Sequence, residues 1–250
     1  LINIFSFNII WVFIECLPIL FAVKYGIDLW IWLRAVLGRK GVAVLSTVIS
    51  LANFGWYAVT ANLFASSMIH LGNNFGLGLD KGVWAPILGT LCVLLGTLIA
   101  LGGPEVIKGT NRFLVVALLF VGLIIVGICF VAVPIRDIMN VQPAIQENLT
   151  PIERFMMSGE GNVAVAFSWS TQAFVLPRLA KSERSGYWAT ALSYGVVAPF
   201  FAATGGVMAL AMFVKTGVYE SDPTTMLSTL STPAFALLSL LLVAFANIGT

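Results

Sequence analysis

Charged side chains are scarce in this sequence. Asp, Glu, Lys and Arg make up 10% of the chain, whereas soluble domains carry roughly a quarter. Hydrophobic residues reach 59%, and the mean hydropathy is +0.99. This composition excludes an ordinary soluble domain, and a net charge of only +2 gives no reason to expect a nucleic-acid partner.

The residue types of catalytic and metal sites are also few. The chain has one histidine, His70, and three cysteines that all lie in apolar stretches: Cys16, Cys92 and Cys129. No Ser-His-Asp, Cys-His or HExxH arrangement is present, and no carboxylates pair within an apolar stretch. We therefore expect no enzyme and no disulfide, with the thiols serving as core residues and His70 lying at the rim of a span.

Long apolar runs dominate what remains. Each is long enough to cross a hydrocarbon core of ~30 Å as a helix. We expect an all-α, polytopic transmembrane bundle in one domain, with seven spans near residues 1–23, 43–70, 84–101, 113–134, 162–179, 190–214 and 232–250. Because the chain opens at Leu1 and stops at Thr250 inside apolar runs, we expect a fragment of a longer protein.

Basic residues are concentrated in every second loop of this alternating topology. Nine of the 13 lie in the loops 24–41, 102–112 and 178–187, whereas most acids lie in the opposite loops. The positive-inside rule makes these three loops cytoplasmic. Within 24–41, "LWIWLRAVL" predicts a short interfacial helix. We expect "GGPEVIKGTNR" (102–112) to form a tight loop, because Gly–Gly–Pro stops a helix.

The second span carries a polar stripe. Its members step by four and three residues and therefore share one helical face: Ser46, Ser50, Asn53, Tyr57 and Thr60. Trp56 flanks the stripe about 13 residues into the span, near mid-depth and away from the interfacial belt of tryptophans. Such a stripe either joins neighbouring helices or faces a ligand.

A second polar run, "FSWSTQAFVLP" (167–177), interrupts the sixth expected span. Ser168, Thr171 and Gln172 share a face, with Trp169 beside it. An unpaired amide in an apolar interior costs several kcal/mol, so Gln172 needs a partner. Pro177 removes a helical hydrogen bond, and irregular backbone at membrane depth is tolerated where it is buried or lines a cavity. An interrupted polar span is typical of a transporter's midplane site, although a structural kink is the alternative.

Two further features stay open at this point. Asn247 and Thr250 lie one turn apart in the last span and offer oxygen ligands to a polar solute or a hard cation, or serve as packing residues. Glu15 is the only acid well inside a span, which makes it either a functional residue or one that reaches the interface.

Four stretches, taken in order, resemble the nucleobase–cation symporter-1 family. "KYGIDLWIWLRAVLGRKG" is similar to the family's link between its second and third helices, and "NFGWYAVTANLF" to its third helix. "FSWSTQAFVLPRLAKS" is similar to its sixth helix and "LLLVAFANIGT" to its eighth. One departure is that Arg178 follows Pro177 where the family has an Asp-aromatic-x-Arg run, which leaves both the substrate and the coupling ion open.

The resemblance implies a partial LeuT-like fold, a five-plus-five inverted repeat of which this chain holds helices two to eight. It implies that Trp56 and Trp169 sandwich a planar base. Edge-reading positions would be Asn53 or Thr60, Ser168, Thr171 and Asn247, and Thr250 would contribute a hydroxyl to a sodium site.

The function implied is cation-coupled symport, driven by sodium or protons, in the plasma (inner) membrane. The substrate would be a cytosine, purine, uracil, allantoin, hydantoin or thiamine-precursor type of molecule, moved by alternating access. Besides that substrate and the lipid bilayer, no obligate protein partner is evident. The alternatives are a LeuT-fold carrier of amino acids or other small zwitterions, and a receptor or scaffold that transports nothing.

Overall fold

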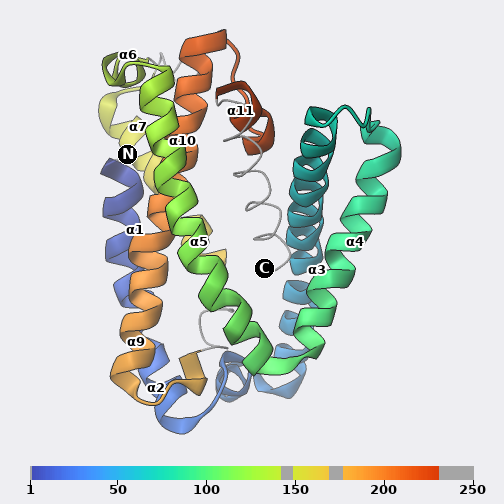
Figure 1. Cartoon of the computed structure of the whole chain (residues 1–250). Helices are drawn as coiled ribbons and strands as arrows, with labels where there is room; N and C mark the ends of the chain where they lie inside the picture. Colours follow the sequence, from blue (N-terminus) through green and yellow to red (C-terminus); the bar gives the residue numbers. More distant parts are fainter. Residues whose placement is uncertain (1, 142–148, 169–176, 231–250) are drawn as a thin grey trace. The chain divides into compact units, whose positions relative to one another are not determined.

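The computed structural model describes residues 2–141, 149–168 and 177–230 and is 87% helical (Figure 1). The described residues contain no strand. Four helical stretches are long and apolar enough to cross a membrane: Leu29–Asn74, Lys81–Leu101, Glu105–Ala132 and Glu183–Thr216. The expectation of an all-helical chain is confirmed, and these four stretches agree with four of the expected spans.

The other three expected spans do not each correspond to one long helix. Residues 1–23 contain two shorter helices, α1 (Ile2–Glu15) and α2 (Leu17–Tyr25). They separate at Cys16 because Pro18, in the first turn of α2, has no N–H to continue the hydrogen-bond ladder. Helix α7 (Pro151–Ser168) begins well before residue 162. Residues 232–250 lie outside the described part of the chain.

The chain forms two compact units. The first comprises Leu1–Ile49 and Gln142–Ala203, and the second comprises Ser50–Val141 and Thr204–Thr250. The boundaries fall inside two helices, α3 (Leu29–Asn74) and α10 (Ala198–Thr216), so each of these helices contributes to both units.

In the first unit, α1 packs on α7 and on the π-helical turn η3 (Ser193–Val197), while α2 packs on α9 (Glu183–Leu192) and on the 3₁₀ turn η2 (Pro177–Leu179). The buried residues of its core are Val12, Cys16, Ile19, Ala22 and Ala191. Small residues allow this close approach: a Cβ on Gly195 would lie 3.6 Å from Cγ1 of Val12. This core holds the start of the chain against the segments that follow the polar run.

The predicted connector helix is confirmed. Its start is capped by Asp28, whose Oδ1 accepts a hydrogen bond from the amide of Ile31 at 2.9 Å. Its end is set by Gly38, which has φ 66° and ψ 176° and breaks helical geometry inside α3. The side chain of Trp32 stacks on Phe21 of α2, with 5.8 Å between the ring centroids. The segment from Leu29 to Gly38 is therefore a separate short helix, and the long apolar helix begins after Gly38.

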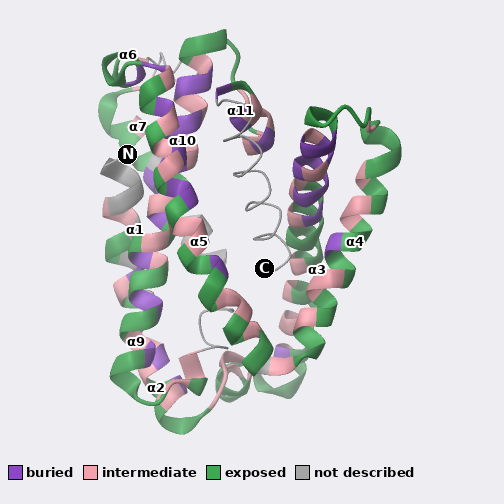
Figure 2. Cartoon of the chain, viewed as in Figure 1, coloured by how far each residue is buried: buried purple, intermediate pink, exposed green. Residues whose placement is uncertain are grey.

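The second unit is centred on α5 (Gly103–Ala132), α10 and α11 (Pro223–Leu230). The buried residues that these helices share include Ile125, Cys129, Met208, Ala211 and Leu227. Figure 2 shows this burial along α10 and α11, whereas α4 (Lys81–Leu101) is mostly exposed and has Cys92 as its buried residue. All three cysteines are buried and form no disulfide, as predicted.

Helix α11 begins at a built N-terminal cap. Asp222 accepts hydrogen bonds from the amide of Thr224 at 2.9 Å and from its hydroxyl at 2.6 Å. Burial by itself raises the pKa of Asp222. The bonds from Thr224, the charge of His70 and the Thr225 hydroxyl outweigh burial and leave this pKa below its ordinary value.

The loop expected at residues 102–112 is much shorter in the structure. Helix α4 ends at Leu101 and α5 begins at Gly103, whose φ of 81° turns the chain between them. Pro lies in the first turn of α5, where its missing N–H costs nothing. Glu105 and Lys108 then pair across one helical turn at 3.6 Å. The Gly–Gly–Pro stop was right, but the polar residues after it are helical.

Candidate functional site

The polar and aromatic residues in the middle of α3 form one face, as their spacing predicts. We call Asn53, Trp56, Tyr57 and Thr60 the Trp56 face; they follow one another at helical positions i, i+3, i+4 and i+7. Trp56 is 46% exposed and Tyr57 is 52% exposed. All four residues belong to the second unit. The face therefore presents rings and polar atoms at the helix surface.

The position of this face along the helix follows from the bounds of α3. Gly38 and Asn74 bound the long helical part of α3, and Trp56 lies halfway between them. At ~1.5 Å per residue, each half is about 27 Å long. Tryptophans that anchor a protein to the bilayer surface lie near helix ends. Trp56 lies far from both ends, so an anchoring role does not explain it.

The polar atoms of the face are only partly satisfied inside the chain. The hydroxyl of Thr60 donates to the carbonyl of Tyr57 at 3.0 Å, which keeps its lone pairs available as acceptors. The half-buried amide of Asn53 and the hydroxyl of Tyr57 make no hydrogen bond with any described residue. An amide left unpaired in an apolar medium costs several kcal/mol. Water, a solute or another polar group must therefore meet this surface in the membrane.

Towards the end of α3 the helix becomes buried. Phe64 packs with Cys92 and Leu88 of α4. The helices approach closely at Gly89, where a Cβ would lie 3.6 Å from the carbonyl oxygen of Ala61. The Trp56 face thus ends where α4 packs on α3, near Ala61 and Phe64.

The second predicted group of site residues is the polar run 167–177, and the structure describes it only up to Ser168 and again from Pro177. Ser168 is the last residue of α7, and Pro177 opens η2, a 3₁₀ turn. The backbone that follows the polar run is therefore not α-helical at Pro177, as its proline predicts. The remaining predicted residues lie outside the described part of the chain: Trp169, Thr171, Gln172, Asn247 and Thr250.

The pocket expected between the two polar helices is not tested by this structure. Asn53, Trp56 and Thr60 belong to the second unit, whereas Ser168 belongs to the first. A shared pocket between them stays a prediction. Among the described residues, no group of three or more His, Cys, Asp or Glu side chains gathers as a metal site.

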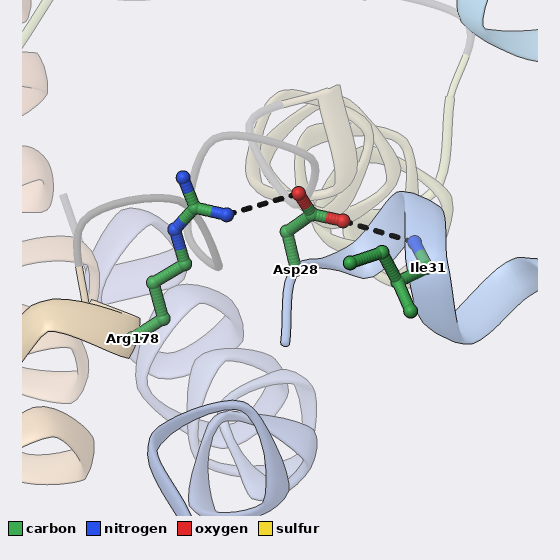
Figure 3. A network of polar contacts seen from close by, with 3 residues as sticks. All are labelled: Asp28, Ile31 and Arg178. Carbon is green, nitrogen blue, oxygen red and sulfur yellow. Dashed lines mark hydrogen bonds and ion pairs between the residues drawn. The ribbon is translucent and has the colours of Figure 1, made fainter. Parts of the chain in front are cut away.

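An ion pair next to the polar run was missed by the sequence reading. Nη1 of Arg178 lies 3.0 Å from Oδ2 of Asp28, and the other carboxylate oxygen of Asp28 caps the connector helix through Ile31 (Figure 3). The two side chains are 34% and 23% exposed. This carboxylate ties the segment after Pro177 to the start of the connector helix. An Asp before a helix signals a cap, but a partner 150 residues away leaves no local pattern.

Comparisons with known proteins add no relative: no family model, no curated protein and no solved structure matches this chain.

Proposed function

We propose that this chain is the transport domain of a cation-coupled symporter that carries a planar nucleobase or a related heterocycle by alternating access. The observation that carries this proposal is the Trp56 face, in the middle of a helix that is long and apolar enough to cross a membrane. Its indole is half exposed, and its Asn53 amide has no hydrogen-bond partner among the described residues. An aromatic ring stacks on a flat solute while amides and hydroxyls bind its edge. The coupling ion is sodium or a proton, and the parent fold is LeuT-like.

One further observation supports a carrier. The 3₁₀ turn at Pro177–Leu179 places irregular backbone directly after the polar run, a feature that membranes tolerate where backbone is buried or lines a cavity.

The ion pair also supports the proposed orientation. Asp28 and Arg178 belong to two of the three loops that we assign to the cytoplasm, and they meet at 3.0 Å within the first unit. Two loops that touch lie at the same end of that unit. This agrees with the positive-inside assignment.

The test is uptake of labelled cytosine, uracil, hypoxanthine and allantoin by cells that express the full-length protein and lack their own carriers. Trp56→Ala removes the stacking ring, and Trp56→Phe keeps one. Trp84→Ala is the matched control, because Trp84 is similarly exposed (39%) but lies in the first turn of α4.

Stacking of a base on an aromatic ring is worth about 1–3 kcal/mol, or about 5- to 150-fold in affinity. We expect Trp56→Ala to raise KM by that factor at unchanged surface expression, Trp56→Phe to raise it less, and Trp84→Ala to leave it unchanged. Equal kinetics in Trp56→Ala and the parent would refute the proposed site. Uptake of amino acids without competition from any nucleobase would identify the zwitterion carrier instead.

A further inference from the structure

A surface groove in the first unit lies apart from the Trp56 face. It runs between α2 and α9 and has a volume of about 400 Å³. We call it the α2–α9 groove, and its lining residues are Leu17, Leu20, Glu183, Arg184, Tyr187 and Trp188.

The groove changes character along its length. Glu183 and Arg184 occupy the first turn of α9, directly after the loop. Tyr187 and Trp188 follow one turn further on, and Leu17 begins α2, two turns away from the end of that helix at Tyr25. One end is therefore charged and adjoins the loops, and the other end is apolar. This is the polarity of a lipid molecule at a membrane surface.

The aromatic wall of the groove is held in place by α1. The rings of Phe13 and Trp188 meet edge to face with 5.9 Å between centroids. The hydroxyl of Tyr187 donates to the backbone carbonyl of Phe13 at 3.4 Å. Tyr and Trp are enriched where hydrocarbon meets headgroups, because each has an apolar ring and a polar edge.

The apolar end continues onto a surface that faces outward. Leu17 is 52% exposed and Trp188 is 45% exposed, and Ile14 on α1 and Leu192 on α9 are also half exposed. In a membrane protein such a surface contacts acyl chains. A lipid with its headgroup at Glu183 and Arg184 would lay a chain along these residues.

The charged end holds two opposite charges without partners. Neither Glu183 nor Arg184 forms an ion pair or a side-chain hydrogen bond with a described residue, whereas Arg178 nearby in the sequence is paired with Asp28. A guanidinium binds phosphate through two parallel N–H donors. A carboxylate beside it accepts hydrogen bonds and repels a second negative charge. The combination matches a headgroup that carries one phosphate and one primary ammonium.

We propose that the α2–α9 groove binds an aminophospholipid of the phosphatidylethanolamine type. Arg184 binds the phosphate, Glu183 accepts hydrogen bonds from the ammonium, and Leu17 and Trp188 contact the first part of an acyl chain. Phosphatidylcholine fits less well, because its quaternary ammonium has no N–H to donate. Phosphatidylglycerol leaves Glu183 without a cation.

The test measures the rise in unfolding temperature of the full-length protein in detergent on addition of short-chain phosphatidylethanolamine, phosphatidylcholine or phosphatidylglycerol with matched acyl chains. A ligand that binds only the folded state stabilises it more, at a given concentration, the tighter it binds. We expect the largest rise with phosphatidylethanolamine, and none with water-soluble phosphoethanolamine at the same concentration. A larger rise with phosphatidylglycerol, an equal rise with phosphatidylcholine, or a full rise with phosphoethanolamine would overturn the proposal.

Single substitutions test the roles of Glu183 and Arg184 in binding the headgroup. Glu183→Gln should abolish the preference for phosphatidylethanolamine over phosphatidylcholine. Arg184→Gln should lower the affinity for every phospholipid about tenfold, as expected for loss of a charged hydrogen bond. Glu105→Gln and Lys108→Gln are matched controls from an exposed pair on α5 and should change nothing. Each variant is compared with its own lipid-free baseline, so a small loss of helix stability does not enter. An unchanged lipid preference in Glu183→Gln would refute the ammonium site.

Discussion

Gly186 is a position in the first unit where the addition of one methyl group should lower stability. A Cβ there would lie 2.6 Å from Cγ2 of Val23, 3.3 Å from Cβ of Ala180 and 3.4 Å from the carbonyl oxygen of Pro177. Carbon atoms in good contact are ~3.5–4.0 Å apart. The methyl group therefore overlaps Val23 by about 1 Å. Cβ of Ala180 and the carbonyl oxygen of Pro177 prevent it from moving away from Val23.

Relief of this overlap costs free energy. Val23 is branched at Cβ and has few alternative rotamers, and Gly186 is buried. Overpacking of a filled core costs about 1–3 kcal/mol. Replacement of a helical glycine by alanine returns up to about 1 kcal/mol through helix propensity. We expect Gly186→Ala to lower the free energy of unfolding by about 1–2 kcal/mol net.

The assay is denaturant unfolding of the full-length protein in detergent micelles, with Gly127→Ala as the matched control. Gly127 lies in α5, and no atom lies within 4 Å of the position that its Cβ would take, so alanine there should be neutral or stabilising. Val23→Ala removes the clashing methyl groups. In the double variant, the loss should be smaller than the sum of the two single losses by at least about 0.5 kcal/mol. Full stability of Gly186→Ala, or strict additivity with Val23→Ala, would refute this packing.

Two predictions concern capping carboxylates. Asp28→Asn keeps the cap and loses the partly exposed ion pair with Arg178, so it should cost no more than about 1 kcal/mol. Asp28→Ala should cost about 1 kcal/mol more, because the cap on the connector helix is lost as well; equal losses on denaturant unfolding would contradict this division. The pKa of Asp222 is depressed below its ordinary value of 3.8, so its stabilisation is complete above about pH 4 and is lost as pH falls through the folded-state pKa. The difference in unfolding temperature between the parent and Asp222→Ala should thus be constant from pH 7 to about pH 4 and shrink below it; shrinkage already near pH 6 would contradict this assignment.

Composition and spacing were enough to predict the features that depend on residues close together in the sequence. Scarce charge and apolar runs predicted an all-helical chain. The pair of signals in 24–41, an Asp before the apolar segment and a Gly after it, marks a short helix whose ends are now seen at Leu29 and Gly38. The periodic stripe on α3 placed Asn53, Trp56 and Thr60 on one face, because a helix converts spacing directly into direction.

The features that the sequence did not reveal depend on contacts between distant segments. Asp28 finds Arg178 across 150 positions, and only the packing of α2 on η2 brings them together. The helix that begins at Pro151, by contrast, starts at a local signal. Thr150 and Glu153 form reciprocal hydrogen bonds, 2.8 Å from the Thr150 amide to Oε2 and 3.4 Å from the Glu153 amide to Oγ1. This Thr-x-x-Glu capping box is readable in the sequence, and Pro151 fits the first position of a helix.

Because of the π-helical turn Ser193–Val197, a single helical repeat cannot be used to assign the faces of residues 190–214. A π turn contains one residue more than an α turn, so every side chain after it is rotated by about 100° relative to a continuous α-helix. A face defined by Trp188 and Leu192 therefore cannot be extended through α10 by steps of three and four. The turn lies where Gly195 meets Val12, so the extra residue occurs at a contact with α1. Faces before Ser193 and after Val197 must be assigned separately, and the lipid-facing surface inferred for α9 accordingly ends at this turn.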